Sequence, residues 1–106
     1  MTEERMGYKV RIIVSPTKAI VTPANLLVNS GDIVEFKLVN STTATLMFPE
    51  ENLFNKSDQI VVLSSNSPEP LEVNPDIPPG DYPYSVFCDE INNFAKGNSA
   101  PRMIVD

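Results

Sequence analysis

At 106 residues, with 42% hydrophobic and 21% charged side chains, the chain can bury one core and is too short for two, so we expect a single domain spanning residues 1–106 rather than a disordered chain. Its formal net charge of −6 would repel the phosphate backbone of a nucleic acid, which argues against such a partner. No apolar run approaches the roughly 20 residues that a membrane-spanning helix needs, so we expect a soluble, acidic protein without a membrane span.

Frequent turn residues favour short strands over long helices. The chain holds ten prolines, and an internal proline removes a helix hydrogen bond and clashes with the preceding turn. Asn29-Ser30-Gly31-Asp32 predicts a tight turn, and residues 50–58 are predicted to hold one helical turn after Pro49. Nine alternating or β-branched apolar segments lie over residues 8–14, 18–22, 26–28, 33–40, 44–48, 59–63, 71–73, 82–88 and 102–105. From them we expect about eight short strands, arranged as an antiparallel β-sandwich.

The segment that ends on the single cysteine carries most of the functional argument. A Pro79-Gly80 turn leads into a predicted strand in which Tyr82, Tyr84 and Cys88 alternate onto one face, so the sulfur should lie in or beside the core. A free cysteine most often acts as a small buried hydrophobe. The neighbouring carboxylates would raise the pKa of the thiol, which further weakens it as a nucleophile.

Two stretches of the sequence resemble the cupredoxin family. Residues 21–36 are similar to the N-terminal pattern of that family, in which an apolar strand and a Gly-Asp turn lead into Val-x-Phe. Pro79-Gly80-Asp81-Tyr82, Cys88-Asp89-Glu90-Ile91, Asn98 and Ile104-Val105 resemble the binuclear-copper branch, which includes the soluble domain of cytochrome c oxidase subunit II. The resemblance implies an all-β, cupredoxin-like Greek-key β-sandwich.

The resemblance also shows which residues stand where the family holds copper. The family's two histidines correspond to Ala44 and Ser99, and its two cysteines to Cys88 and Asn92. The residue that supplies its backbone carbonyl corresponds to Glu90, and its methionine to Arg102. Copper electron-transfer centres combine two imidazoles with a thiolate, and the chain contains no histidine. The resemblance therefore implies a cupredoxin-type domain with no cofactor and a vestigial site. The alternative is a copper or other metal ion held by Cys88 with Met103 as a second soft ligand.

Catalysis has little support in the sequence. Without histidine there is no base of the usual kind near neutral pH, and no nucleophile or phosphate-binding motif is present. We therefore expect that the protein is not an enzyme.

The preferred function is a binding or structural module that contacts a protein partner, or another copy of itself, through the loops around Ala44-Thr45, Phe54 and residues 88–98. Phe54 and Phe94 are the aromatic side chains expected to be exposed for that contact. The alternative is an atypical metal-binding or redox cupredoxin that uses Cys88.

The start of the chain bears on its compartment. Met1 to Met6 are polar and acidic and carry no secretory signal as written, which points to the cytoplasm. If a leader has been removed, the periplasm or another extracytoplasmic compartment is expected instead. A lone cysteine excludes an internal disulfide, which agrees with a reducing compartment.

Overall fold

A computed structural model describes residues 6–55, 59–65, 67–95 and 100–106, and within these ranges the chain folds into strands, turns and loops without a helix. No described segment is therefore a helix able to cross a membrane. The strands are β1 (Gly7–Val14), β2 (Ala19–Thr22), β3 (Asn25–Val28), β4 (Ile33–Val39), β5 (Thr43–Met47), β6 (Phe54–Asn55), β7 (Ile60–Ser64), β8 (Glu69–Val73), β9 (Gly80–Pro83), β10 (Ser85–Cys88), β11 (Asn93–Phe94) and β12 (Arg102–Val105).

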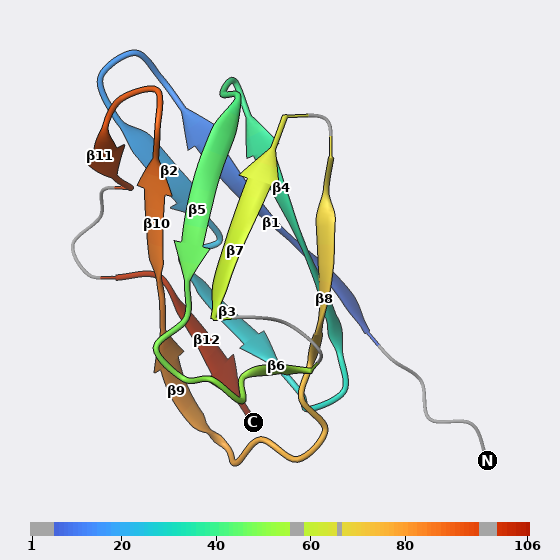
Figure 1. Cartoon of the computed structure of the whole chain (residues 1–106). Helices are drawn as coiled ribbons and strands as arrows, with labels where there is room; N and C mark the ends of the chain where they lie inside the picture. The colour runs from blue at the N-terminus through green and yellow to red at the C-terminus, as the bar shows by residue number, and fades with distance from the viewer. Residues whose placement is uncertain (1–5, 56–58, 66, 96–99) are drawn as a thin grey trace.

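The strands form three sheets, with orders β2-β1-β4-β8-β6, β11-β10-β5-β7 and β3-β12-β9. Figure 1 shows the second sheet in front of the first, with the third at the end where the C-terminus lies. The predicted all-β sandwich is confirmed. The prediction that it is antiparallel throughout is wrong, because β1 pairs with β4 and β3 with β12 in parallel. Such parallel pairs join segments far apart in the chain, so local periodicity does not reveal them.

The count of about eight strands differs from the twelve in the structure because short elements form at bends. The predicted strand over 82–88 divides at Tyr84: β9 pairs with β12, whereas β10 pairs with β5. At the division, the Tyr84 amide donates to the carbonyl of Pro101, 2.9 Å away. Residues 93–94, expected to be loop, form β11. The helical turn is absent from the described part of residues 50–58, where a turn leads directly into β6, and residues 56–58 lie outside the described ranges.

Four aromatic rings form the centre of the core. Phe36, Phe48, Phe54 and Tyr84 pack with ring centroids 4.9–6.1 Å apart, mostly edge to face. The expectation that Phe54 is exposed is wrong, because only 5% of it is accessible. Its strand β6 pairs with β8, opposite Val73, and this pairing turns the ring inward although, apart from Leu53, its neighbours in sequence are polar.

A buried carboxylate fixes the start of the parallel pair. Asp32 follows Gly31, whose φ of +87° suits glycine, so the predicted tight turn is confirmed. Asp32 is 4% exposed. Its Oδ1 accepts a hydrogen bond from the Met6 amide (3.1 Å), and its Oδ2 accepts one from the Asn29 amide (2.9 Å). The side chain thus joins the entry of β1 to the turn before β4, where the parallel register begins at Gly7 and Ile33.

Candidate functional site

Cys88 ends β10 directly opposite Ala44 of β5, and both residues are fully buried. Tyr84, Val86 and Cys88 share the core face, as the sequence predicts, whereas Tyr82 is half-buried and its hydroxyl donates to the carbonyl of Pro78. Burial raises the pKa of the Cys88 thiol, and the Asp89 carboxylate raises it further. The protonated thiol is therefore the stable form near neutral pH.

Polar bonds close the turn that follows Cys88. Asp89 accepts a hydrogen bond through Oδ2 from the Thr43 hydroxyl (2.6 Å), and Glu90 accepts one through Oε1 from the Thr42 amide (3.1 Å). Asn92 is exposed and has a φ of +48°, a left-handed conformation that asparagine tolerates at a turn. The carboxylates thus hold the cysteine turn against the loop between β4 and β5.

Arg102 and Met103, two further positions of the predicted site, lie elsewhere. Arg102 is opposite Pro83, and its guanidinium Nη1 is 3.2 Å from Oδ2 of Asp81. Met103 is buried opposite Tyr82, on the other side of the division at Tyr84 from Cys88. Figure 1 shows β12 beside β9, away from the tip of β10. The structure does not bring Met103 or Arg102 to the cysteine, and Ser99 lies outside the described residues.

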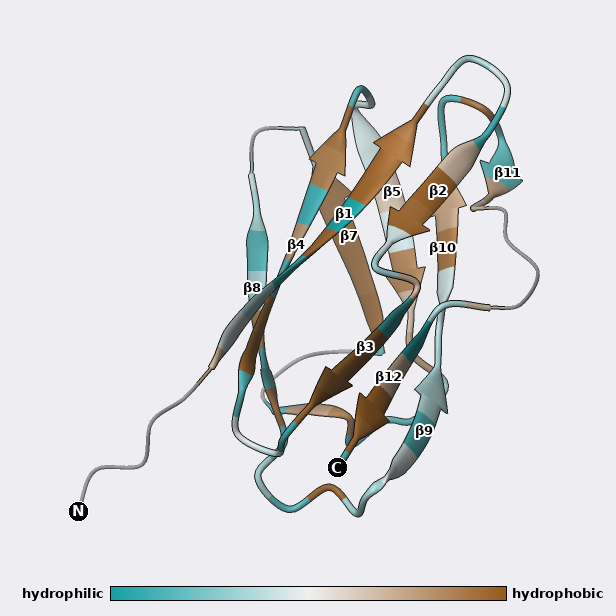
Figure 2. Ribbon diagram, turned by 180° about the vertical axis from the view of Figure 1, so that it is seen from behind, coloured by the Kyte–Doolittle hydropathy of each residue, from teal (hydrophilic) through white to brown (hydrophobic). Residues whose placement is uncertain are grey.

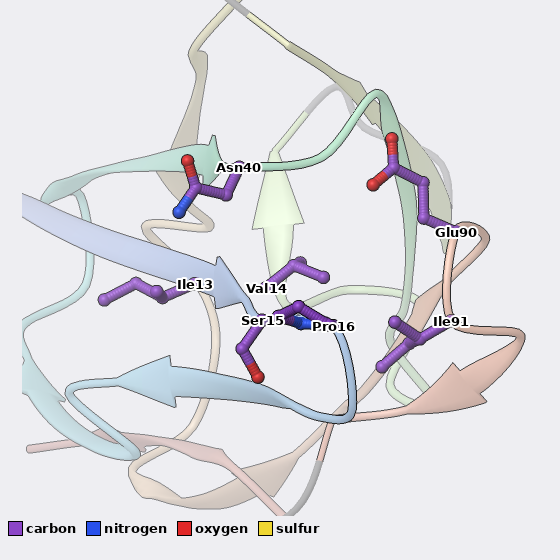
Figure 3. Close-up of a pocket in the computed structure, with 7 residues that line it drawn as sticks. All are labelled: Ile13, Val14, Ser15, Pro16, Asn40, Glu90 and Ile91. Atoms are coloured by element: carbon purple, nitrogen blue, oxygen red, sulfur yellow. The ribbon is translucent and has the colours of Figure 1, made fainter.

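A pocket of about 510 Å³ opens beside the cysteine turn. Figure 3 shows its walls coming from the end of β1 and the turn after it, from the residue that follows β4, and from the turn after β10. These segments contribute Ile13, Val14, Ser15, Pro16, Asn40, Glu90 and Ile91. Sequence reasoning missed this pocket. The parallel pairing of β1 with β4 brings Ile13 and Asn40 together across 27 residues, and no local pattern signals it.

The residues around Cys88 do not fit the copper centre of the family that the sequence resembles. A thiol and an alanine methyl group meet where the family has a thiolate and an imidazole. Within the described residues, no three Cys, Asp or Glu side chains gather in a way that could hold a metal ion. The sequence supplies no imidazole anywhere. The residues present therefore lack the imidazole ligands that, together with a thiolate, bind copper in both of its oxidation states.

The comparisons with known proteins concern the fold. No protein-family model and no curated protein matches the sequence. Solved structures do match, among them a mutant fern plastocyanin (TM-score 0.58, 19% identity, covering 92% of this chain and 99% of that one). Fet3p, a multicopper oxidase that functions in iron import, matches with a TM-score of 0.56 and 16% identity over 97% of this chain, which spans only 23% of Fet3p.

A reduced auracyanin from the photosynthetic bacterium Roseiflexus castenholzii matches with a TM-score of 0.51 and 12% identity, over 98% of this chain and 99% of that one. Together these likenesses confirm the cupredoxin-like β-sandwich. At such low identities they say nothing of what the chain binds.

Proposed function

We propose that this chain, which has the cupredoxin fold, is one copper-free binding domain derived from the binuclear-copper branch, and that it contacts a protein partner through the end that holds Cys88. The observation that carries the proposal is the buried pairing of Cys88 with Ala44. A thiol in that position is protonated, dry and without a nitrogen ligand, so it suits packing better than electron transfer. No catalytic step is assigned, because the sequence has no histidine base and no nucleophile motif.

The pocket supports a partner of particular chemistry. Ile13, Pro16 and Ile91 offer an apolar wall, while Glu90 and Asn40 provide polar groups. One Glu90 oxygen accepts from the Thr42 amide, and a carboxylate keeps further lone pairs for a cation. A lysine side chain, with an apolar stem and a charged tip, matches this combination. The net charge of −6 would also draw a basic partner towards the domain.

The copper-free part of the proposal is tested by adding copper to the purified protein. We expect no intense thiolate-to-copper absorption and no well-resolved paramagnetic spectrum, and we expect negligible metal in untreated protein and in a Cys88→Ala variant alike. A stoichiometric metal ion that is present in untreated protein and lost in Cys88→Ala would overturn the proposal. It would favour the alternative of an atypical metal or redox protein that uses Cys88.

The binding part is tested by nuclear magnetic resonance with a short peptide, Leu-Lys-Leu with blocked ends, and with Leu-Glu-Leu as its control. We expect the lysine peptide to shift the amide signals of Ser15, Asn40 and Ile91 and the glutamate peptide to leave them unchanged. Glu90→Gln is the matched variant, because its side-chain oxygen can still accept from the Thr42 amide while the charge is gone. Shifts that are equal for both peptides, or unaffected by Glu90→Gln, would contradict a cation site.

A further inference from the structure

The strands of the sheet β11-β10-β5-β7 place no charged residue on their outer face, and the Asp89 carboxylate lies only at its Thr43 end. Strand alternation puts Ala44, Leu46, Val86 and Cys88 in the core and turns their neighbours outward. The outward residues that carry the argument are Thr45, Met47, Ile60, Val62, Phe87 and Phe94. No charged residue stands among the outward positions of these four strands, although the whole chain has a net charge of −6.

This face carries a strip of mostly apolar side chains that reaches an exposed strand. The pairing registers align Phe94, Phe87, Thr45 and Val62 in one row across the four strands. The Phe87 and Phe94 rings pack edge to face with centroids 5.1 Å apart. Ile60 and Val62 are 58% and 61% exposed and Phe94 is 48% exposed. Figure 2 shows β7 coloured as hydrophobic along its length.

The same strand has an open backbone edge. Among the described residues, β7 is the last strand of its sheet and pairs with β5, and on its other edge only Ser64 forms a bridge, to Ser67. The Phe48 amide donates to the Gln59 carbonyl (2.7 Å), and the Ser65 amide donates to the Thr42 carbonyl (3.0 Å). In an antiparallel ladder, hydrogen-bonded pairs alternate with pairs whose amides and carbonyls point away from each other. The backbone groups of Ile60 and Val62 therefore point outward, and no described residue hydrogen-bonds to them.

Edge strands in monomeric proteins commonly carry charges or prolines, which block pairing with another chain. The edge strand β9 follows this rule, with Asp81 and Pro83. β7 reads Ile-Val-Val-Leu-Ser and, like the edge strands β2 and β3, contains neither device, but it has the most exposed apolar side chains of its sheet, at Ile60 and Val62. Apolar side chains and unpaired backbone groups thus occur at the same two residues, which is the arrangement expected of a strand that another strand covers.

We propose that a second copy of this chain covers β7, by antiparallel β7–β7 pairing about a two-fold axis at Val61. In this register Ile60 of one copy faces Val62 of the other, and each such pair exchanges amide-to-carbonyl hydrogen bonds in both directions. The two sheets become one continuous sheet, and the exposed Ile60 and Val62 side chains of the two copies meet on its outer face.

Charge favours a second copy over a basic partner at this surface. The strip itself contains no acidic residue, and the Asp89 carboxylate at its Thr43 end already accepts a hydrogen bond, so a basic protein gains little from this surface. β7 itself carries no charge, so pairing along this strand places no like charges directly opposite one another, although each copy has a net charge of −6. Antiparallel pairing also directs their Asp89 and Glu90 turns, which lie beside the Thr43 end of β5, towards opposite ends of the dimer.

The test combines sedimentation with amide hydrogen exchange across micromolar to millimolar protein. We expect a monomer–dimer equilibrium in which the Ile60 and Val62 amides become protected as dimer forms. Val62→Pro removes an outward donor without touching the pairing with β5, and it should weaken dimerisation at least about tenfold. Val62→Thr keeps the donor and the β-branch and should retain most of the dimer.

Ile20→Lys and Val62→Lys make a charge-matched pair, because both replace an exposed apolar residue on an edge strand. Only Val62→Lys should dissociate the dimer. Circular dichroism and thermal melting verify that each variant folds. A monomer at every concentration would overturn the proposal. So would a dimer in which exchange at Ile60 and Val62 does not depend on concentration, or assembly into larger species.

Discussion

The most direct prediction concerns the reactivity of Cys88. The residue is fully buried, and burial followed by the Asp89 charge raises the pKa of its thiol. A thiol reagent can reach the sulfur only when the protein opens, so labelling of the folded protein reports the opening free energy. A domain of this size is stable by about 5–15 kcal/mol, and even an opening that costs about 5 kcal/mol slows labelling by roughly three to four powers of ten.

The assay compares labelling by an aromatic disulfide reagent in buffer with labelling in denaturing urea at the same pH. We expect slow labelling in buffer that accelerates as urea approaches the unfolding midpoint. If the folded protein labels within about tenfold of the unfolded rate, the sulfur is accessible and the reasoning about the vestigial site fails. Exposure of that kind would reopen the possibility of a ligating or reactive thiol.

Two substitutions at Cys88 separate packing from chemistry. Cys88→Ala removes one buried heavy atom and should lower the free energy of unfolding by about 1–2 kcal/mol. Cys88→Ser also buries a hydroxyl without a designed partner, so it should cost more than the alanine variant, by about 1–3 kcal/mol. The raised pKa favours the protonated thiol in the folded protein. The free energy of unfolding should therefore fall as the pH rises above about 9, where the unfolded thiol ionises, and Cys88→Ala should lose that part of the fall.

Three further predictions concern the fold that supports this site. Burial raises the pKa of Tyr84, so the contribution of this residue to stability is constant below about pH 10. Above that pH the contribution falls by up to about 1.4 kcal/mol per pH unit as the unfolded tyrosine ionises, and Tyr84→Phe should remove this part of the fall in urea titrations at different pH values. Asp32→Ala leaves two backbone amides without their acceptor and should cost about 2 kcal/mol, whereas Asp106→Ala at an exposed position should cost almost nothing; equal melting temperatures would contradict the clamp. Phe36→Ala leaves a cavity at the centre of the aromatic cluster and should lower the free energy of unfolding, measured with a chemical denaturant, by about 3–5 kcal/mol. Phe94→Ala should lower it by less than about 1 kcal/mol, and the reverse order would contradict the assignment of the core.

The sequence by itself determined the class of fold and the face on which the cysteine lies. Side chains alternate between the two faces of a strand, so the local pattern alone predicts one buried face, which carries Val34, Phe36 and Leu38. The same rule puts Cys88 inside with Tyr84 and Val86. The composition alone shows that no site within the chain can contain an imidazole ligand, because the sequence has no histidine.

Only the tertiary structure decided which segments are neighbours. Phe54 and Leu53 lie in an otherwise polar stretch of the sequence, yet the pairing of β6 with β8 places the Phe54 ring in the core. The pocket beside Glu90 exists because β1 and β4 end side by side in parallel, and β7 is exposed because no strand follows it in its sheet. The two-residue hydrophobic period in the sequence predicts on which face of its own strand a side chain lies. Strand order and edges arise from hydrogen bonds between distant segments, and these depend on the whole chain.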